Sequence, residues 1–307
     1  MRVLFIFLDG IGLGENDPET NPFARAKMPV LNSLLDGRAL LKDSAPFYGE
    51  RATMLAVDPS VGVSGLPQSA TGQGILVTGI NIPAELGYHY GPKPNPEVAA
   101  FLGDGTLFSR FAKAGKKTAL LNAYPPRYFD GIDSGKRLYS SIPLAVTKAG
   151  LGLFKHEDLF AGRALSADFT GAGWRTMLGF PDAPGMEPQQ AGRKLVKLAM
   201  EYDFSLFEYW ASDYAGHKQQ METAVELMET FDEVLGGIMD EINEDELLVL
   251  VTSDHGNMED LSTRKHTPAH VPAIVIGNKS AREKFTRGLK DLTDIAPAIW
   301  KMVIEKP

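Results

Sequence analysis

The chain has 307 residues and no cysteine, which excludes disulfides, thiolate metal sites and a cysteine nucleophile. Its net charge of -8 argues against a general nucleic-acid-binding surface, although a local basic pocket could still hold an anion. The 44% hydrophobic and 23% charged residues are ordinary for a soluble globular protein.

The first apolar run, Val3–Leu8, has only about six residues and is followed by Asp9. This length fails both as a signal peptide and as a transmembrane span, and it suits a buried strand. We therefore expect a cytoplasmic protein that does not bind a membrane. The sequence gives no indication of the oligomeric state.

Short apolar runs alternate with helical patterns along the chain, which predicts an α/β protein with a largely parallel sheet covered by helices. The predicted strands, buried on both faces, are Val3–Leu8, Thr118–Leu121, Ser205–Ala211, Leu247–Thr252 and Ala273–Ile276. The predicted helices are Phe23–Leu35, Ala70–Thr78, Leu107–Ala114, Gln189–Met200, Glu222–Ile242 and Asp294–Val303.

The stretch from about Tyr124 to Gly185 does not continue this alternation of strands and helices. It contains Pro125-Pro126 and Gly-rich turns, and few of its segments have the hydrophobic periodicity of a helix or a strand. We expect residues 124–185 to form a small inserted cap or lid. The catalytic core would then consist of residues 1–123 and 186–307.

Acidic and imidazole side chains follow the predicted strands, where ligand sites of open α/β sheets gather. Asp9 has an ordinary alternative as a turn or cap residue, and Asp213 with His217 could form a surface turn. Asp254 and His255 follow a very apolar strand and would be costly to bury without a partner. Because their oxygen and nitrogen donors suit Zn²⁺ or Mn²⁺, the set predicts a dinuclear metal site.

The motifs that carry a family resemblance occur in order at both ends of the chain. They are Asp9-Gly-Ile-Gly, Asn21-Pro22…Ala26…Pro29-Val-Leu31, Ser69-Ala-Thr-Gly72, Asp213-x-x-Gly-His217, Asp254-His255-Gly-Asn257 and His266-Thr…Val271-Pro272. This ordered set resembles the alkaline phosphatase superfamily, in particular the metalloenzyme branch that holds cofactor-independent phosphoglycerate mutase and phosphopentomutase. The resemblance implies a three-layer α/β/α core of the alkaline phosphatase kind.

The resemblance also implies two divalent ions, Zn²⁺ or Mn²⁺, and a phosphoserine intermediate. One ion would be held by Asp213, His217 and His266. The second would be held by the side chains of Asp9, Asp254, His255 and the nucleophile Ser69.

Ser69 matches the nucleophile of this family because it stands three residues before Gly72. A serine hydroxyl is a poor nucleophile at neutral pH, and a bound cation favours its alkoxide form. The start of the predicted helix Ala70–Thr78 would favour negative charge as well. Thr71 is the rival nucleophile, with a role in the first helical turn as its ordinary explanation.

Three further residues are candidates for binding a small phosphorylated substrate: Arg127, His89 and His270. Arg127 follows Tyr124-Pro-Pro in the expected cap. A solvated charged surface is the alternative for Arg127, a packed turn for His89, and a structural role for His270. Lys136, Arg137, Arg163 and Arg175 are further basic residues of the same stretch.

The fate of the phosphoserine decides the class of enzyme. Gln73 stands where the mutases carry His, and the insertion is much smaller than the inserted domain of the phosphoglycerate mutase, so we expect a phosphatase or phosphodiesterase. A phosphomutase is the alternative. A metal-binding regulatory protein without turnover is a further hypothesis from another class, although every expected ligand position is filled.

Overall fold

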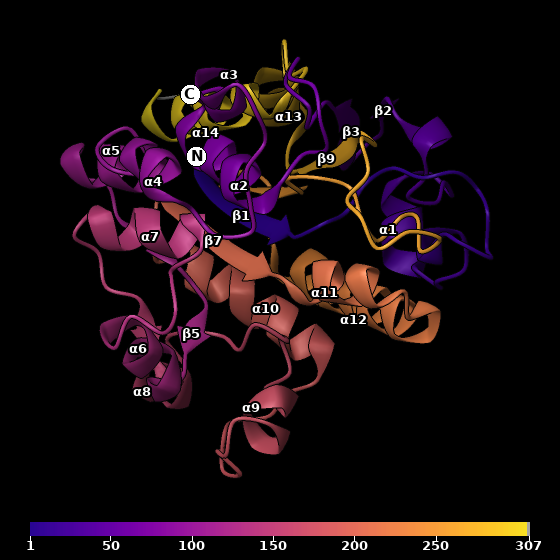
Figure 1. The fold of residues 1–307 in the computed structure, drawn as a ribbon. Coiled ribbons are helices and arrows are strands. Elements are labelled where there is room, and N and C mark those ends of the chain that lie inside the picture. Colours follow the sequence, from indigo (N-terminus) through magenta and orange to yellow (C-terminus); the bar gives the residue numbers. More distant parts are fainter. Residues whose placement is uncertain (306–307) are drawn as a thin grey trace.

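The computed structural model describes residues 1–305 and has a seven-stranded sheet between two layers of helices (Figure 1). The strand order is β2-β3-β9-β8-β1-β7-β4. The strands are β1 (Arg2–Leu8), β2 (Phe47–Tyr48), β3 (Ala52–Val57), β4 (Thr118–Leu120), β7 (Phe204–Tyr209), β8 (Leu247–Thr252) and β9 (Val271–Ile276). This architecture confirms the predicted α/β fold class.

Five of the seven strands run in the same direction, which agrees with the predicted largely parallel sheet. The neighbours β8, β1, β7 and β4 are parallel to one another, whereas β9 is antiparallel to both β8 and β3, and β2 is antiparallel to β3. The chain passes from β8 into β9 without a crossover helix, and parallel neighbours need such a crossover. Because β9 is antiparallel to β8, the loop that connects them, which contains His266, lies at the carboxyl end of β8.

Each face of the sheet has its own apolar core. On β1, Leu4 and Ile6 pack in one core, and Phe5 and Phe7 pack in the other, as the period of two requires. The first core is covered by α1 (Pro29–Leu34), α10 (Pro188–Ala199) and α12 (Met221–Glu241). The second is covered by α2 (Ser69–Thr78), α5 (Leu107–Lys113), α7 (Ser141–Lys148), α13 (Lys279–Thr286) and α14 (Ile295–Ile304).

Two predicted elements were wrong in their extent. The helix Phe23–Leu35 is a 3₁₀ turn, Pro22–Ala24, and a separate helix α1, because Pro29 lacks an amide hydrogen and disfavours a helical residue before it. The strand predicted to reach Ala211 ends at Tyr209, and Ala211 is instead the first residue of helix α11 (Ala211–Lys218).

The stretch expected to be a cap contains a two-stranded sheet and several short helices (Figure 1). These elements are β5 (Ala123–Tyr124), β6 (Phe154–Lys155), α6 (Pro126–Asp133), α8 (His156–Phe160) and α9 (Ala172–Thr176). Helix α7, from the same stretch, packs on α2, and Ser141 Oγ donates to the Ala70 carbonyl over 2.7 Å. The division into core and cap stays a prediction.

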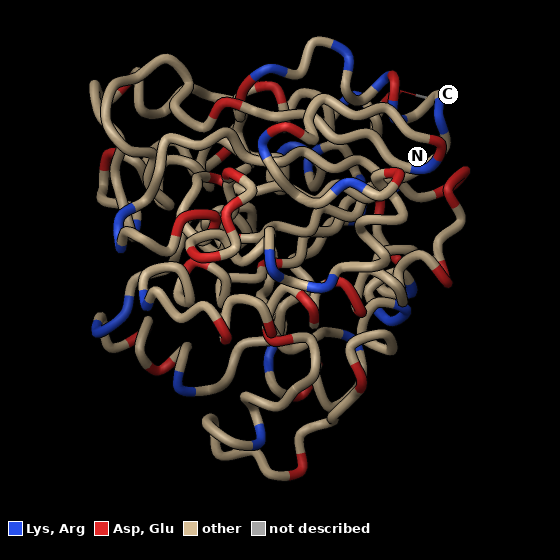
Figure 2. Tube along the Cα trace, turned by 90° about the vertical axis from the view of Figure 1, so that its right-hand side faces the viewer, with Lys and Arg blue, Asp and Glu red and all other residues tan. Residues whose placement is uncertain are grey.

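Two short helices, α3 (Ile82–Leu86) and α4 (Pro96–Phe101), follow α2. Within residues 1–305, each helix is too short or too polar to cross a bilayer. Lys, Arg, Asp and Glu are interspersed along the trace (Figure 2). The expectation that the protein does not bind nucleic acid stays a prediction.

A close approach of α10 and α12 gives a test of the fold. A Cβ atom added at Gly192 would lie 1.9 Å from the Val234 carbonyl oxygen, whereas one at Gly236 would meet Val30 at an ordinary 3.4 Å. We expect Gly192→Ala to lower the free energy of unfolding by about 1–3 kcal/mol or more, because the backbones must move apart. The control Gly236→Ala should be neutral or stabilising by up to about 1 kcal/mol. Urea denaturation measures both variants, and equal effects would contradict this helix packing.

Candidate metal centre

The candidate site lies where neighbouring parallel strands end. Asp9 directly follows β1, Asp254 comes two residues after β8, and α11, which begins just after β7, carries Asp213 and His217. Because β8, β1 and β7 are adjacent and parallel, their carboxyl ends meet at one edge of the sheet. The topology thus brings together residues that are more than 200 positions apart in the chain.

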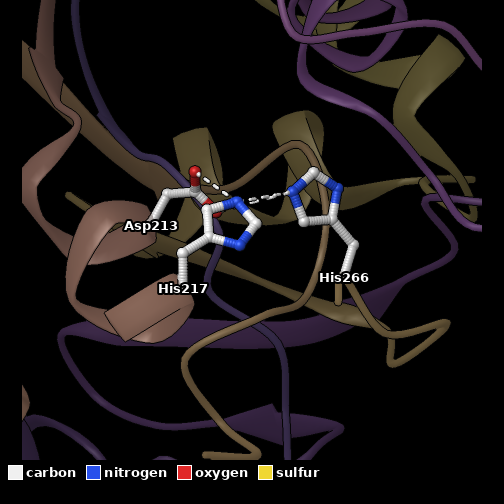
Figure 3. A group of neighbouring side chains, drawn as sticks. All are labelled: Asp213, His217 and His266. Carbon is white, nitrogen blue, oxygen red and sulfur yellow. Dashed lines mark hydrogen bonds and ion pairs between the residues drawn. The ribbon is translucent and has the colours of Figure 1, made fainter. Parts of the chain in front are cut away.

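The first donor group contains Asp213, His217 and His266, which face one another in the structure (Figure 3). Asp213 Oδ2 lies 3.3 Å from His217 Nε2, one helical turn further along α11. His266 Nε2 lies 3.3 Å from His217 Nε2 and 3.7 Å from Asp213 Oδ1. These are the three residues that the resemblance assigns to the first ion.

The second donor group contains Asp9, Asp213 and His255, whose donor atoms all lie within 4.8 Å of one another. His255 Nε2 lies 3.5 Å from Asp9 Oδ1 and 3.5 Å from Asp254 Oδ2. Ser69 Oγ lies 3.0 Å from the same nitrogen. All members of the expected second set therefore adjoin His255, and Asp213 belongs to both groups, which the sequence did not indicate.

The three imidazoles are held so that Nε2 faces the carboxylates. His217 Nδ1 lies 2.7 Å from the Arg264 carbonyl, and His266 Nδ1 lies 2.8 Å from the Pro67 carbonyl. His255 Nδ1 lies 3.3 Å from the carbonyl of the next residue. A carbonyl only accepts, so Nδ1 carries the hydrogen and Nε2 of a neutral ring presents its lone pair, as in metal-binding histidines. The two lone pairs that meet over 3.3 Å need a cation between them.

Buried carboxylate oxygens without partners give the same indication. Asp9 Oδ1 and both side-chain oxygens of Asp254 are buried, and they have no hydrogen-bond partner among residues 1–305. Burial raises the pKa of Asp9 well above its usual value, and the neighbouring Asp254 and Asp213 raise it further. Burial also raises the pKa of Asp254 and lowers that of His255. The site therefore lacks positive charge, and divalent cations fit this donor set.

Two residues not predicted as part of the site orient the donors. Asn257 Nδ2 donates to Asp213 Oδ1 over 2.6 Å. The buried Glu259 carboxylate accepts the backbone N–H groups of Gly12 (2.9 Å) and Asn257 (2.8 Å), and also the hydroxyl of Thr267. Asn257 stands in the Asp254 motif, whereas no sequence signal marks Glu259 as buried.

Glycines allow the donor segments to approach one another. Gly10 has a φ of +69°, and a Cβ atom there would lie 2.6 Å from Asp213 Oδ1. A Cβ atom at Gly72 would lie 2.8 Å from Asp254 Cβ. Any larger residue at either position would displace a donor.

The hydroxyl of Thr71, the rival nucleophile, forms hydrogen bonds with backbone carbonyls. This hydroxyl, fully buried, lies 3.1 Å from the Gln68 carbonyl and 3.3 Å from the Tyr90 carbonyl, and it can donate to either. Gln73, at the position where the mutases carry His, places Nε2 3.4 Å from Asp9 Oδ2. Thr71 therefore shapes the loop around α2, and Gln73 adjoins the second donor group.

The three candidate substrate residues are not brought into the donor groups. His89 is about half-buried, and its Nε2 lies 3.2 Å from the Val63 carbonyl. Arg127 and His270 are exposed. None of the three belongs to either donor group. Their roles in binding a substrate stay predictions.

Glu208, a buried acid inside the apolar strand β7, was not predicted as a site residue. The Tyr124 hydroxyl donates to its Oε2 over 2.8 Å. Burial raises the pKa of Glu208 to about 7, although Tyr124 and Lys93 oppose this shift. The sequence feature that marks Glu208 is a charged residue within a run of strand residues.

Comparison with known proteins places this geometry in context. The family described as the Metalloenzyme superfamily matches residues 176–306. A 2,3-bisphosphoglycerate-independent phosphoglycerate mutase of Clostridium novyi is 40% identical over 115 residues, which cover 35% of this chain and 22% of the mutase. The chain's match thus spans about a quarter or less of the length of such relatives.

Solved structures share the fold across the whole chain. An alkaline phosphatase from the Antarctic bacterium TAB5 superposes with a TM-score of 0.56 at 14% identity, covering 100% of this chain and 99% of that one. A phosphoglycerate mutase of Leishmania mexicana gives a TM-score of 0.51 at 12% identity, covering 100% and 96%. At these identities the likeness concerns the fold alone.

The donor geometry predicts the metal content. We expect the protein to bind two divalent ions, and saturating Zn²⁺ or Mn²⁺ to stabilise it by about 2.7 kcal/mol per site at 100 times the dissociation constant. His266→Ala should lower the metal content, whereas His270→Ala, which removes an exposed ring outside both groups, should retain two ions. Elemental analysis after dialysis measures both. Equal metal loss in the two variants would show that the first donor group is wrongly assigned.

Proposed function

We propose, for a chain that belongs to the alkaline phosphatase superfamily, that the protein transfers a phosphoryl group from a phosphate ester to Ser69 in a reaction that requires two divalent metal ions. The observation that carries the proposal is the position of Ser69 Oγ, 3.0 Å from His255 Nε2 and thus beside the donors of the second group. A reacting hydroxyl and a cation-binding cage adjoin each other there.

The local structure suits Ser69 to this role. Ser69 is the first residue of α2, where backbone N–H groups and the helix dipole favour the negative charge of a phosphate. Because Ser69 Oγ lies 3.0 Å from His255 Nε2, a cation held by this nitrogen would also lie beside the serine oxygen. Bound divalent ions supply what the side chains lack, since they favour the alkoxide and neutralise phosphoryl oxygens.

Water is the acceptor that we favour for the second half of the reaction. The water oxygen would bond to phosphorus while the bond from phosphorus to Ser69 Oγ breaks, and the serine oxygen would regain a proton. The side chain of His217 is 42% exposed, so the first donor group adjoins solvent. This exposure supports a phosphatase or phosphodiesterase, because a mutase must keep water from the phosphoenzyme.

A phosphomutase is the second candidate. The relatives named phosphoglycerate mutases favour it, since they match this chain at up to 40% identity over part of its length. In that case a hydroxyl of the retained substrate would take the phosphoryl group in place of water.

The role of Ser69 can be tested against its neighbour. Ser69→Ala should lower turnover of the metal-loaded protein about 10³-fold or more, because no phosphoserine can form. It should leave at least one metal ion bound. Thr71→Val removes the rival hydroxyl at nearly constant volume and should retain turnover. It should cost about 1–3 kcal/mol in stability, because the Tyr90 N–H, which donates to this hydroxyl over 3.3 Å, loses its acceptor.

Steady-state assays on an aryl phosphate and acid quenching for the phosphoenzyme measure these effects. An inactive Thr71→Val variant with an active Ser69→Ala variant would contradict the assignment. Absence of turnover on a panel of phosphomonoesters, phosphodiesters and sugar phosphates would favour the regulatory hypothesis instead.

The acceptor can be identified on a single substrate. We expect phosphate release from a sugar phosphate or phosphoglycerate to exceed isomer formation, since the first donor group is open to water. Phosphorus NMR of one reaction mixture measures both products. Isomer formation that outpaces phosphate release by a wide margin would establish the mutase alternative.

A further inference from the structure

A second polar cluster adjoins the donor groups on the side of the sheet that carries Ser69. In the parallel pairing of β1 and β7, Phe7 lies opposite Glu208. Phe7, Phe204 and Leu206 all pack in the core beneath α2. Side chains of a strand alternate between the two faces of the sheet. Asp9 therefore follows Phe7, and Glu208 follows Leu206, on the face whose helical layer contains Ser69.

One carboxylate oxygen of Glu208, Oε1, is available to accept a hydrogen bond from a ligand. The side chain is 6% exposed, and its Oε2 accepts the Tyr124 hydroxyl over 2.8 Å. Among residues 1–305, no donor forms a hydrogen bond with Oε1. Oε1 is not one of the fully buried atoms without a partner, so it remains accessible, and a donor group of a ligand can hydrogen-bond to it.

Lys93 supplies a donor and a positive charge beside this carboxylate. Its ammonium group interacts electrostatically with both Glu208 and Asp9. Among the described residues, Lys93 forms no direct ion pair with Glu208, although the two charges are near enough for Glu208 to raise the pKa of Lys93 against the lowering by burial. A hydroxyl group, which both donates and accepts hydrogen bonds, matches this pair of side chains.

Aromatic rings from the stretch after β4 form one wall of this cluster. The rings of Tyr124 and Tyr128 have centroids 4.5 Å apart, and the Arg137 guanidinium lies 5.2 Å from the Tyr128 centroid. The Tyr124 hydroxyl joins this wall to Glu208. The cluster thus combines an apolar surface with the Glu208 acceptor and the cations Lys93 and Arg137.

We propose that Glu208 and Lys93 bind the alcohol part of the substrate, and that the substrate is a polyol phosphate with a free hydroxyl near the ester. The hydroxyl donates to Glu208 Oε1 and accepts from Lys93 Nζ. This inference rests on the proposed function, since it places the leaving group beside Ser69. A bare cation at Glu208 is less favourable, because the Lys93 charge is already nearby.

The test uses binding, so that it does not depend on turnover. The metal-loaded Ser69→Ala protein is titrated by calorimetry with glycerol phosphate and with propyl phosphate, which lacks the additional hydroxyls. We expect glycerol phosphate to bind about tenfold more tightly, the equivalent of one hydrogen bond to a charged group. Adding Glu208→Gln or Lys93→Met should remove most of this preference, whereas the affinity for propyl phosphate changes little.

Glu201→Gln, which alters an exposed acid at the opposite edge of the sheet, is the matched control and should keep the preference. Equal affinities for the two esters in the parent protein, or binding of neither, would overturn the inference. Loss of one of two metal ions in Glu208→Gln would overturn it as well, and would assign Glu208 to a cation. Failure of the proposed function shows separately, as absence of phosphate release from every ester tested with the unmutated protein.

Discussion

The whole site depends on an excess of negative charge that the polypeptide does not balance. Three carboxylates, those of Asp9, Asp213 and Asp254, converge at one sheet edge beside His255 and His266, and burial lowers the pKa of both imidazoles and so disfavours their charged forms. Bound cations would supply the missing positive charge and stabilise the ionised carboxylates. The glycines, the carbonyl-bound histidines and the position of Ser69 all have their explanation in this requirement.

The sheet topology explains how the donors converge. Parallel strands bring Asp9 and Asp254 to the same edge, and the helix after β7 adds Asp213 and His217 one turn apart. The antiparallel strand β9 supplies the remaining ring, because the loop that enters it starts from the end of β8. If β9 were parallel to β8, a crossover helix would connect them, and the loop that enters β9 with His266 would lie at the opposite end of the strands.

The strand ends and the motif histidines could be predicted from sequence, because apolar runs and ordered short motifs are local signals. What could not be predicted depends on contacts between distant segments. The sharing of Asp213 between the two donor groups follows from the approach of α11 to Gly10. The commitment of Thr71 to the Tyr90 carbonyl, and the acid Glu208 within an apolar strand, likewise become visible only when the neighbouring chain is in place.

The close contacts at Gly10 and Gly72 have a consequence for how this protein can evolve. Because a single added carbon there would collide with Asp213 or Asp254, the donor side of the site tolerates almost no variation in side-chain size. The edge near Tyr124 is formed by short helices and turns, which accept insertions and exchanges more readily. A lineage with this chain as its ancestor would therefore vary in sequence at that edge while the two donor groups stay fixed.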